Sequence, residues 1–392
     1  MKSSNYNLIA MDKTKILYLI ESLSGGGAEK ILTTTIKALN PLLFDITLCC
    51  ICDMGKFKDE IPPNVQYRYI LPNPKNFSKI KKLLYRIFYK SIYNWLPLSL
   101  IYRLFIPQGS QIEIAYVEGF VTKLLSHSTN KNARKIAWVH TDLVNNPWTE
   151  IVFKNQDEEE FAYSKYQQIV AVSKTVEKAF IQKFEGITNP IITLYNPIDS
   201  EDIIRKSKYN QSIPPPDPEI IRIVSVGRMI KLKGYDRLLS IINKLIKDRY
   251  RIELWLIGDG NQLPVLQRYA ETHQLNDNVK FWGFQPNPYS IMSQCNLFVC
   301  SSYSEGYSTA ITESLILGIP VITTECSGMH ELLGDDEFGI ITENSESALY
   351  KGIKSLLDDF ILLNHYKNQA ILRGKDFSMA CLIGQVESFL IE

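Results

Sequence analysis

Two series of short apolar segments, each alternating with amphipathic helical patterns, limit the fold of this 392-residue chain more than any other feature. The first series begins at residues 16–20 and the second at residues 221–226. Strand-length apolar runs that alternate with helices are typical of parallel sheets with crossover helices on both faces. The sequence therefore predicts an α/β protein with two doubly wound domains.

The same pattern places the strands and a linker. In the first half, strands are expected at 16–20, 44–51, 112–117, 135–139, 169–172 and 191–194. In the second half, they are expected at 221–226, 252–257, 279–282, 297–299, 320–323 and 339–341. Residues 209–218 contain four prolines, which exclude a helix interior or a central strand, so we place the interdomain linker there. A cleft then lies between the carboxyl ends of the two sheets, where open α/β sheets bind ligands.

A glycine-rich loop follows the first predicted strand, at Gly25-Gly26-Gly27. Glycines allow close approach of the backbone to a ligand, and the helix that follows offers free N–H groups to an anion. The spacing is not that of a dinucleotide-binding loop, because position 30 is Lys30. A tight strand-to-helix turn without a ligand explains the glycines equally well.

Two further loops carry charged residues at the ends of strands in the second half. Arg228 and Lys233 follow the first strand there and suit a diphosphate, although a basic surface loop is the alternative. Glu305 and Glu313 flank a helix start at Ser308 or Thr309, so their carboxylates can hold hydroxyls beside that helix end. As isolated acids, either one is more often a solvated charge or a cap.

These loops, in this order, resemble those of the retaining nucleotide-sugar glycosyltransferases of family 4. The resemblance covers most of the chain except residues 61–112. At Tyr307-Ser308 and Met329-His330 the sequence differs from the residues that are most common in the family. The matching segments are Gly26-Gly27-x-Glu29, Trp138-Val139-His140, Val172-Ser173-Lys174, Asn196-Pro197-Ile198-Asp199, Gly227-Arg228, Lys233-Gly234, Gly258-Asp259-Gly260, Gly283-Phe284, Glu305-x7-Glu313, Gly318-Ile319-Pro320 and Ser327-Gly328-x-x-Glu331.

The resemblance implies two Rossmann-like domains that face each other across a cleft, the GT-B arrangement. Residues 1–205 are then the acceptor-side domain, residues 206–218 the linker, and residues 219–375 the nucleotide-sugar domain. Residues 376–392 are expected to form a helix that crosses back to the first domain.

The resemblance also implies the roles of individual residues. Arg228 and Lys233 bind the diphosphate, Glu313 binds the ribose, and Glu305 and His140 contact the transferred hexose. The expected catalytic residues are Glu305, His140, Arg228 and Lys233. The expected substrate-binding residues are Gly26, Gly27, Phe284, Gly306, Tyr307, Ser308, Thr309 and Glu313.

The reaction that this resemblance implies develops negative charge on the departing nucleoside diphosphate. Fixed cations and backbone amides at that position lower the barrier most. The sequence contains no Asp-x-Asp motif, so we expect no metal site, a metal-independent reaction, and no cofactor other than the nucleotide diphosphate sugar donor. A UDP-sugar is favoured over a GDP-sugar, and the transferred group is a hexose or N-acetylhexosamine.

The charge of the chain is distributed unevenly. Lys and Arg number 43 against 42 Asp and Glu, a net charge of +1 that argues against a nucleic-acid partner. Residues 61–112, however, contain eight basic and no acidic side chains. Residues 79–90 mix cations with apolar and aromatic residues, which indicates either a helix that lies on an anionic membrane or a solvated helix face. The membrane contacts are expected at Lys79, Lys81, Lys82, Arg86 and Lys90.

The remaining features concern compartment and partners. The seven cysteines lack paired C-x-x-C spacing, which predicts buried thiols in a reducing compartment. No secretory or membrane-spanning segment is expected, so we predict a cytoplasmic protein, with peripheral contact on the inner face of the cell membrane. The predicted partners are the donor and a saccharide or lipid-linked acceptor in cell-surface glycan synthesis. A sugar-nucleotide epimerase of the same fold and a catalytically silent nucleotide-sugar-binding protein are the alternatives.

Overall fold

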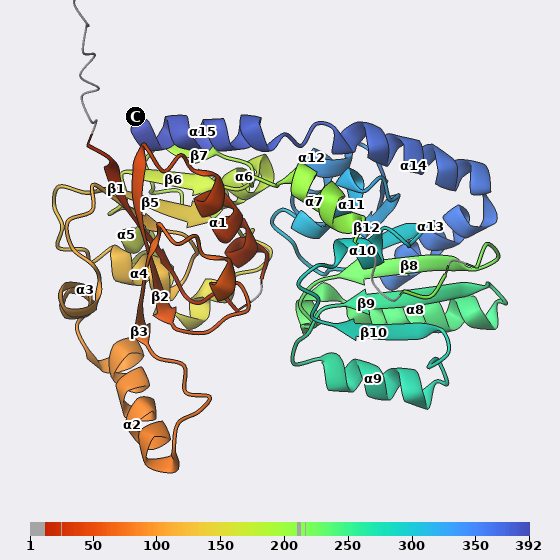
Figure 1. The fold of residues 1–392 in the computed structure, drawn as a ribbon, viewed down its shortest axis with the longest axis horizontal. Helices are drawn as coiled ribbons and strands as arrows, with labels where there is room; N and C mark the ends of the chain where they lie inside the picture. Colours follow the sequence, from red (N-terminus) through yellow and green to blue (C-terminus); the bar gives the residue numbers. More distant parts are fainter. Residues whose placement is uncertain (1–11, 25, 210–212, 216) are drawn as a thin grey trace, which may run out of the picture.

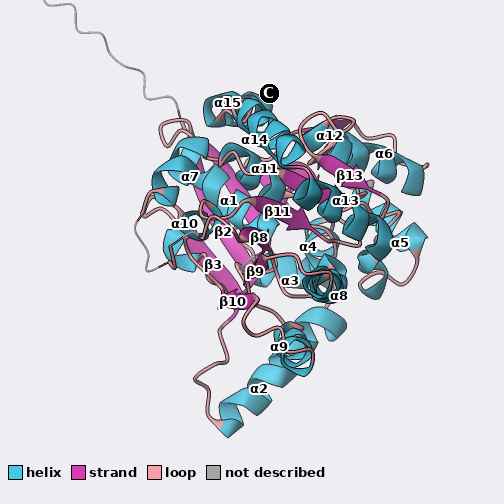
Figure 2. Ribbon diagram, turned by 90° about the vertical axis from the view of Figure 1, so that its right-hand side faces the viewer, coloured by secondary structure: helices cyan, strands magenta, loops and turns pink. Residues whose placement is uncertain are grey.

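The computed structural model describes residues 12–392 apart from residues 25, 210–212 and 216. In these residues, the strands form two sheets, one of seven strands in the order β3-β2-β1-β4-β5-β6-β7 and one of six in the order β10-β9-β8-β11-β12-β13. Neighbouring strands pair in parallel throughout both sheets. Helices surround both sheets, as Figures 1 and 2 show. The prediction of two doubly wound α/β domains is therefore confirmed.

The first sheet is built from the apolar runs that its central strands bury on both faces. Residues 16–20 of the interior strand β1 are at most 1% exposed. The edge strand over Gln66–Leu71 was not predicted, because polar residues interrupt it and only its last two residues are buried. The strands are β1 Thr14–Ile20, β2 Phe44–Cys52, β3 Gln66–Leu71, β4 Ile112–Ala115, β5 Arg134–Val139, β6 Gln168–Ala171 and β7 Ile191–Thr193.

The helices of this half cover the sheet, with one exception. The helix α2 has no buried residue and extends away from the rest of the protein in both views (Figures 1 and 2). The α-helices are α1 Gly27–Ala38, α2 Lys79–Lys90, α3 Leu98–Phe105, α4 Phe120–Leu125, α5 Gln156–Tyr163, α6 Lys174–Lys183 and α7 Ser200–Ser207. The shorter turns are the 3-10 helices η1 Lys58–Glu60 and η3 Trp148–Ile151, and the π-helix η2 Ser91–Trp95.

The second sheet and its helices follow the same alternation. Its strands are β8 Ile221–Val226, β9 Ile252–Ile257, β10 Val279–Gly283, β11 Leu297–Cys300, β12 Val321–Thr324 and β13 Ile340–Thr342. Its helices are η4 Lys231–Lys233, α8 Tyr235–Lys247, α9 Leu263–Thr272, α10 Tyr289–Met292, α11 Thr309–Ile316, α12 Met329–Leu333, α13 Glu346–Asp358 and α14 Phe360–Gly374. Part of the expected linker, residues 210–212 and 216, lies outside the described residues, as does Gly25 of the first loop.

Two helices connect the halves of the molecule. The helix α7 packs against α10 and α11, and its Ile203 belongs to the core of the second domain. Because α7 spans Ser200–Ser207, the expected domain boundary after residue 205 falls inside this helix. The helix α15, Met379–Ile391, runs from the second domain onto the first (Figure 1). There its residues Val386, Phe389 and Leu390 join the core of the first sheet. The Arg134 guanidinium donates a hydrogen bond of 2.6 Å to the Phe389 carbonyl.

The structure tests the expectations about the cysteines and about membrane-spanning helices. All seven cysteines are free thiols, and five are buried. Cys326 is only partly buried and Cys381 is exposed, so the expectation of buried thiols is wrong for these two. Cys381 lies on the outer side of α15, in an apolar run that the sequence suggests is interior. In the part of the chain that the structure describes, no helix has the length and apolar character needed to cross a membrane.

Candidate active site

A cleft of about 1470 Å³ separates the two sheets. Loops after β1, β4 and β5 line it from the first domain, and loops after β8, β9 and β11 line it from the second. These are the carboxyl ends of parallel strands, where open α/β sheets place ligands. The structure therefore brings the three charged and glycine-rich loops of the sequence to one cavity.

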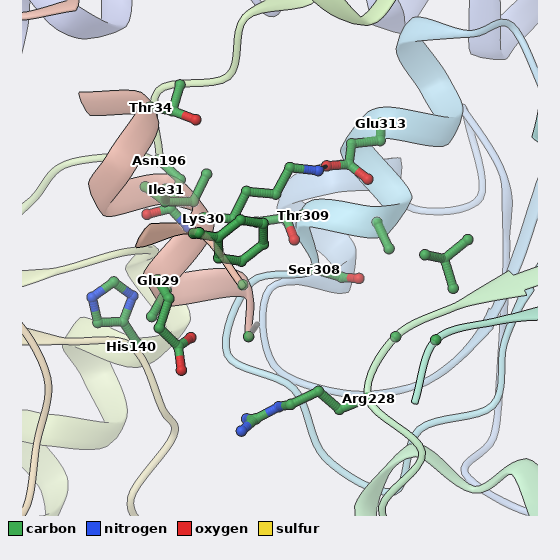
Figure 3. Close-up of a pocket in the computed structure, with 18 of the residues that line it drawn as sticks. Glu29, Lys30, Ile31, Thr34, His140, Asn196, Arg228, Ser308, Thr309 and Glu313 are labelled. Atoms are coloured by element: carbon green, nitrogen blue, oxygen red, sulfur yellow. Dashed lines mark hydrogen bonds and ion pairs between the residues drawn. The ribbon is translucent and has the colours of Figure 1, made fainter. Parts of the chain in front are cut away.

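The loop between β8 and α8 contributes two cations. Arg228 points into the cleft in Figure 3, and Lys233 donates a hydrogen bond of 2.5 Å to Glu305 Oε1. Burial by itself lowers the pKa of Lys233, but the Glu305 carboxylate raises it above its usual value, so the ammonium stays charged. Gly234, at φ +62°, closes the loop against the Ser301 carbonyl, where a Cβ would lie 2.0 Å from the oxygen. The loop is thus held tightly with its cations toward the cleft.

The loop before α11 carries the second group of predicted residues. Glu305 also accepts a hydrogen bond of 2.5 Å from the Ser302 hydroxyl. Ser308 caps α11 by accepting a hydrogen bond from the Ile311 N–H. Thr309 lies toward α1 of the first domain (Figure 3), and a Cβ on Gly27 would lie 3.3 Å from Thr309 Oγ1. The N-terminus of α11 and the glycine loop therefore face each other across the cleft.

Glu313 lies farther along α11 and has its side chain almost fully buried. It accepts hydrogen bonds from Lys30 of the first domain and from the Tyr289 hydroxyl, the latter at 3.3 Å. Lys30 in turn lies 2.6 Å from the Tyr289 oxygen, and Figure 3 shows its side chain reaching from α1 to α11. Burial lowers the pKa of Lys30, but Glu313 and Tyr289 raise it above the usual value. Sequence reasoning missed Lys30, which it considered only as a residue that breaks a glycine motif.

His140 directly follows β5 and faces the cleft from the first domain (Figure 3). Its ring packs 5.0 Å from the Tyr116 ring, centroid to centroid. Burial lowers the pKa of the imidazole to about 4, so the ring is neutral near pH 7. Its Nε2 atom is buried without a hydrogen-bond partner among the described residues. A neutral imidazole in this position can exchange a hydrogen bond with a polar ligand.

Glu118 is a cleft residue that the sequence did not indicate. It follows β4, is 3% exposed, and accepts hydrogen bonds from the backbone N–H groups of His140 at 2.7 Å and Thr141 at 2.6 Å. Burial raises the pKa of its carboxyl to about 7, although these N–H donors lower it. A lone acid after a strand forms no motif, so only its position in the fold identifies it.

The other predicted residues also lie along the cleft. Phe284 packs its ring edge to face with Phe57, 6.3 Å between centroids, and the Lys56 ammonium lies 4.0 Å above it. Gly26 precedes α1, and the Tyr307 ring packs 5.6 Å from that of Tyr195. The basic residues of α2 lie elsewhere, because none of them lines the cleft.

Contacts between the domains keep the cleft narrow. The backbone of Gly306 lies so close to the first domain that a Cβ there would be 1.9 Å from the His140 carbonyl oxygen. The Glu331 carboxylate accepts hydrogen bonds of 2.8 Å from the Lys174 N–H and 2.7 Å from the Thr175 N–H at the start of α6. Glycine at position 306 is therefore required by this approach.

Residues 206–373 match the family model described as "Glycosyl transferases group 1". The second domain of the chain is a group 1 glycosyltransferase domain. This glycosyltransferase is 28% identical over 384 residues to a protein of Campylobacter jejuni, and the match covers 96% of this chain and 99% of that protein. That relative is N-acetylgalactosamine-N,N'-diacetylbacillosaminyl-diphospho-undecaprenol 4-alpha-N-acetylgalactosaminyltransferase. A lipopolysaccharide 1,6-galactosyltransferase of Escherichia coli is 25% identical over 199 residues, 49% of this chain and 52% of that protein.

Solved structures share the fold of the glycosyltransferase. Anabaena HepE, in complex with UDP and glucose, superposes with a TM-score of 0.73 at 18% identity, covering 97% of this chain and 100% of that one. Sucrose-phosphate synthase from Thermosynechococcus elongatus gives a TM-score of 0.73 at 15% identity, covering 96% and 98%. These likenesses show the GT-B fold. Among the described residues, no three His, Cys, Asp or Glu side chains gather in a way that could hold a metal ion.

Proposed function

We propose that this glycosyltransferase moves a hexose or N-acetylhexosamine from a UDP-sugar to a saccharide or lipid-linked acceptor in cell-surface glycan synthesis. The observation that carries the proposal is that Arg228, Lys233, the N-terminus of α11 and Glu313 line one cleft, with Lys233 bonded to Glu305 in the loop before α11. Cations, helix amides and a carboxylate on one cleft match the diphosphate and ribose of a nucleotide sugar. The Campylobacter jejuni relative, named for transfer to a diphospho-undecaprenol saccharide, supports the choice of acceptor.

The donor then occupies the cleft in a definite direction. The diphosphate lies between Arg228, Lys233 and the amides of residues 306–309, and Glu313 binds the ribose. The base lies against the backbone at Phe284, and the hexose lies between Glu305 and His140. Gly26 and Gly27 give the first domain room to approach the diphosphate and hexose. The donor complex of Anabaena HepE, which holds UDP and glucose, supports a UDP-sugar over a GDP-sugar.

The chemistry of transfer follows from these positions. As the sugar–phosphate bond breaks, negative charge grows on the diphosphate, where Arg228, Lys233 and the α11 amides stabilise it. These protein cations take the part that a metal ion plays in other transferases, so we propose a metal-independent reaction. The acceptor hydroxyl attacks the same face that the diphosphate leaves, and its proton passes to the departing phosphate oxygen. The anomeric configuration is retained, and no protein group is needed as the base.

The basic helix α2 fits a second part of the proposal, a contact with the inner face of the cell membrane. Lys79, Lys81, Lys82, Arg86 and Lys90 are all exposed. The same helix exposes large apolar side chains, namely Ile80, Leu83, Leu84 and Ile87. A helix that exposes both cations and apolar residues suits an anionic lipid surface. This contact places a cytoplasmic enzyme beside lipid-linked acceptors.

Two measurements test the function. A thermal-shift series with UDP, GDP and their sugars identifies the donor, because a ligand that binds only the native protein raises its stability. Release of UDP that rises when an acceptor saccharide is added then distinguishes transfer from epimerisation, which needs no acceptor. The proposal is wrong if none of these nucleotides raises the melting temperature. UDP-sugar converted to its epimer without release of UDP favours the epimerase instead.

A further inference from the structure

The first-domain wall of the cleft contains a group of residues that the donor does not use. Glu118, Asn146 and Trp148 line the cavity, and none belongs to the loops assigned to the diphosphate, ribose or base. Small-molecule sites commonly combine an aromatic ring, which offers contact area, with a few polar groups such as a carboxylate and an amide, which orient the ligand.

The Trp148 ring is held in place by the fold. It lies against Gly119, which has φ +81°, and a Cβ at that position would be 2.7 Å from the ring atom Cη2. The loop that carries the ring is fixed by Asp142, whose carboxylate accepts hydrogen bonds from the N–H groups of Val144 at 3.0 Å and Asn145 at 2.9 Å. Trp148 nevertheless remains 36% exposed. An ordered, partly exposed aromatic ring in a cleft offers a flat apolar surface to a ligand.

Glu118 directly precedes Gly119, the residue against which this ring lies, and lines the same cavity. Its Oε1 atom accepts both backbone N–H groups, of His140 and Thr141. A carboxylate has about four lone-pair sites on its two oxygens, so these bonds leave acceptor capacity for a ligand hydroxyl. Because the carboxylate is buried and lines the cleft, that hydroxyl approaches from the cavity.

The group adjoins the place proposed for the transferred hexose. Glu118 holds the backbone of His140, and the His140 carbonyl touches the backbone of Gly306 in the second domain. Gly306 follows Glu305, which is proposed to contact the hexose. A ligand on Trp148 and Glu118 therefore lies next to the sugar that is transferred, on the acceptor side.

We propose that Glu118, Asn146 and Trp148 form the subsite for the terminal sugar of the acceptor. The C–H face of that sugar stacks on Trp148, and its hydroxyls bond to Glu118 and Asn146. This inference rests on the proposed transferase function and adds to it that the acceptor is recognised as a carbohydrate, whether or not a lipid carries it.

The test uses p-nitrophenyl glycosides of hexoses and N-acetylhexosamines as water-soluble acceptor probes, with the full-length enzyme. Loss of one aromatic stack in Trp148→Ala is expected to weaken glycoside binding, measured by ligand-observed NMR, and to raise the acceptor KM about tenfold. Trp148→Phe is expected to restore most of the binding. Glu118→Gln, which keeps an oxygen for both backbone N–H groups, is expected to raise the acceptor KM as well.

The control is Trp95→Ala, an exposed tryptophan at the end of the α2 region, which is expected to leave the acceptor KM unchanged. UDP affinity is measured on every variant and is expected to match the unaltered protein. The subsite is wrong if no glycoside binds, or if Trp148→Ala binds glycosides as the unaltered protein does. A protein that binds glycosides but no UDP contradicts the proposed function instead.

Discussion

The Lys30 ammonium on α1 donates a hydrogen bond to the Glu313 carboxylate on α11, and this bond joins the two domains at the proposed ribose site. Glu313 is 4% exposed, whereas Lys30 keeps contact with solvent. The carboxylate that is proposed to bind the donor is thus already neutralised by a cation from the opposite domain. Closure of the two domains and binding of the donor therefore both involve the Glu313 carboxylate.

Replacing Lys30 is therefore expected to destabilise the protein. Lys30→Met leaves a buried carboxylate without its cation, and because the lysine is partly solvated we expect a loss of about 1–3 kcal/mol. Glu313→Gln in the same background should recover part of it, since no charge then remains unpaired. Urea unfolding measures both. The matched control on the same helix is Lys37→Met, whose pair with Glu60 is exposed on both sides and should cost under about 1 kcal/mol.

Donor affinity is expected to depend on Lys233 and Glu313. Lys233→Ala and Glu313→Ala each remove a charged hydrogen-bonding group, worth about 1.5–3 kcal/mol, and should weaken UDP binding about 10- to 100-fold. Calorimetric titration with UDP measures this. Lys247→Ala and Glu271→Ala change exposed charges away from the cleft and serve as controls. Unchanged UDP affinity in the two cleft variants contradicts the donor assignment.

Glu118 is expected to make stability depend on pH. Its carboxyl has a pKa of about 7 in the folded protein against 4.5 as the unperturbed value, so between these pH values the folded state binds more protons. The free energy of unfolding therefore falls as pH rises from about 5 to 8, by up to about 3 kcal/mol. The titratable group that interacts with it is the Tyr163 hydroxyl, whose pKa burial raises well above its usual value, and the Glu118 charge raises it further.

Glu118→Gln removes this titration and should be more stable than the unaltered protein at pH 8, with little difference at pH 5. Melting temperatures of both proteins across this range measure the effect. A difference that stays constant from pH 5 to pH 8 contradicts the assignment.

The α2 lysines are expected to govern membrane binding. Replacing Lys79, Lys81 and Lys82 by Gln removes about 1 kcal/mol of attraction per charge, or about 100-fold in affinity for anionic vesicles. Flotation with phosphatidylglycerol vesicles measures it, with neutral vesicles as a reference. The same charge change at three exposed lysines of the second domain is the control: Lys247, Lys351 and Lys375. An unaltered protein that does not float with anionic vesicles rules the contact out.

Gly306 is expected to be required for closure of the cleft. Gly306→Ala places a Cβ 1.9 Å from the His140 carbonyl oxygen, so the domains must separate. We expect UDP to bind still, through Arg228 and Lys233, while transfer is largely lost because His140 no longer reaches the hexose. UDP titration and acceptor-dependent UDP release distinguish the two effects. Gly384→Ala on α15, where a Cβ meets no atom within 4 Å, is the control and should keep full activity.

Most of the fold could be predicted from the sequence because buried parallel strands are continuous apolar runs. The strand β3 escaped prediction since it is an edge strand with exposed polar residues. The charged residues of the loops were identifiable because glycine turns and a helix cap mark them. Lys30 and Glu118 were not, because each depends on a partner distant in sequence, Glu313 and the His140 backbone. Only the assembled sheets bring these pairs together.

The return of α15 to the first domain has a consequence for synthesis of the chain. Val386, Phe389 and Leu390 belong to the core of a sheet that begins at residue 14. Until residues 386–390 have left the ribosome, the first domain lacks this part of its core, even after the second domain has emerged. Nascent chains that stop before α15 therefore expose an apolar surface on the first domain. Completion of the first domain thus waits for synthesis of the whole second domain.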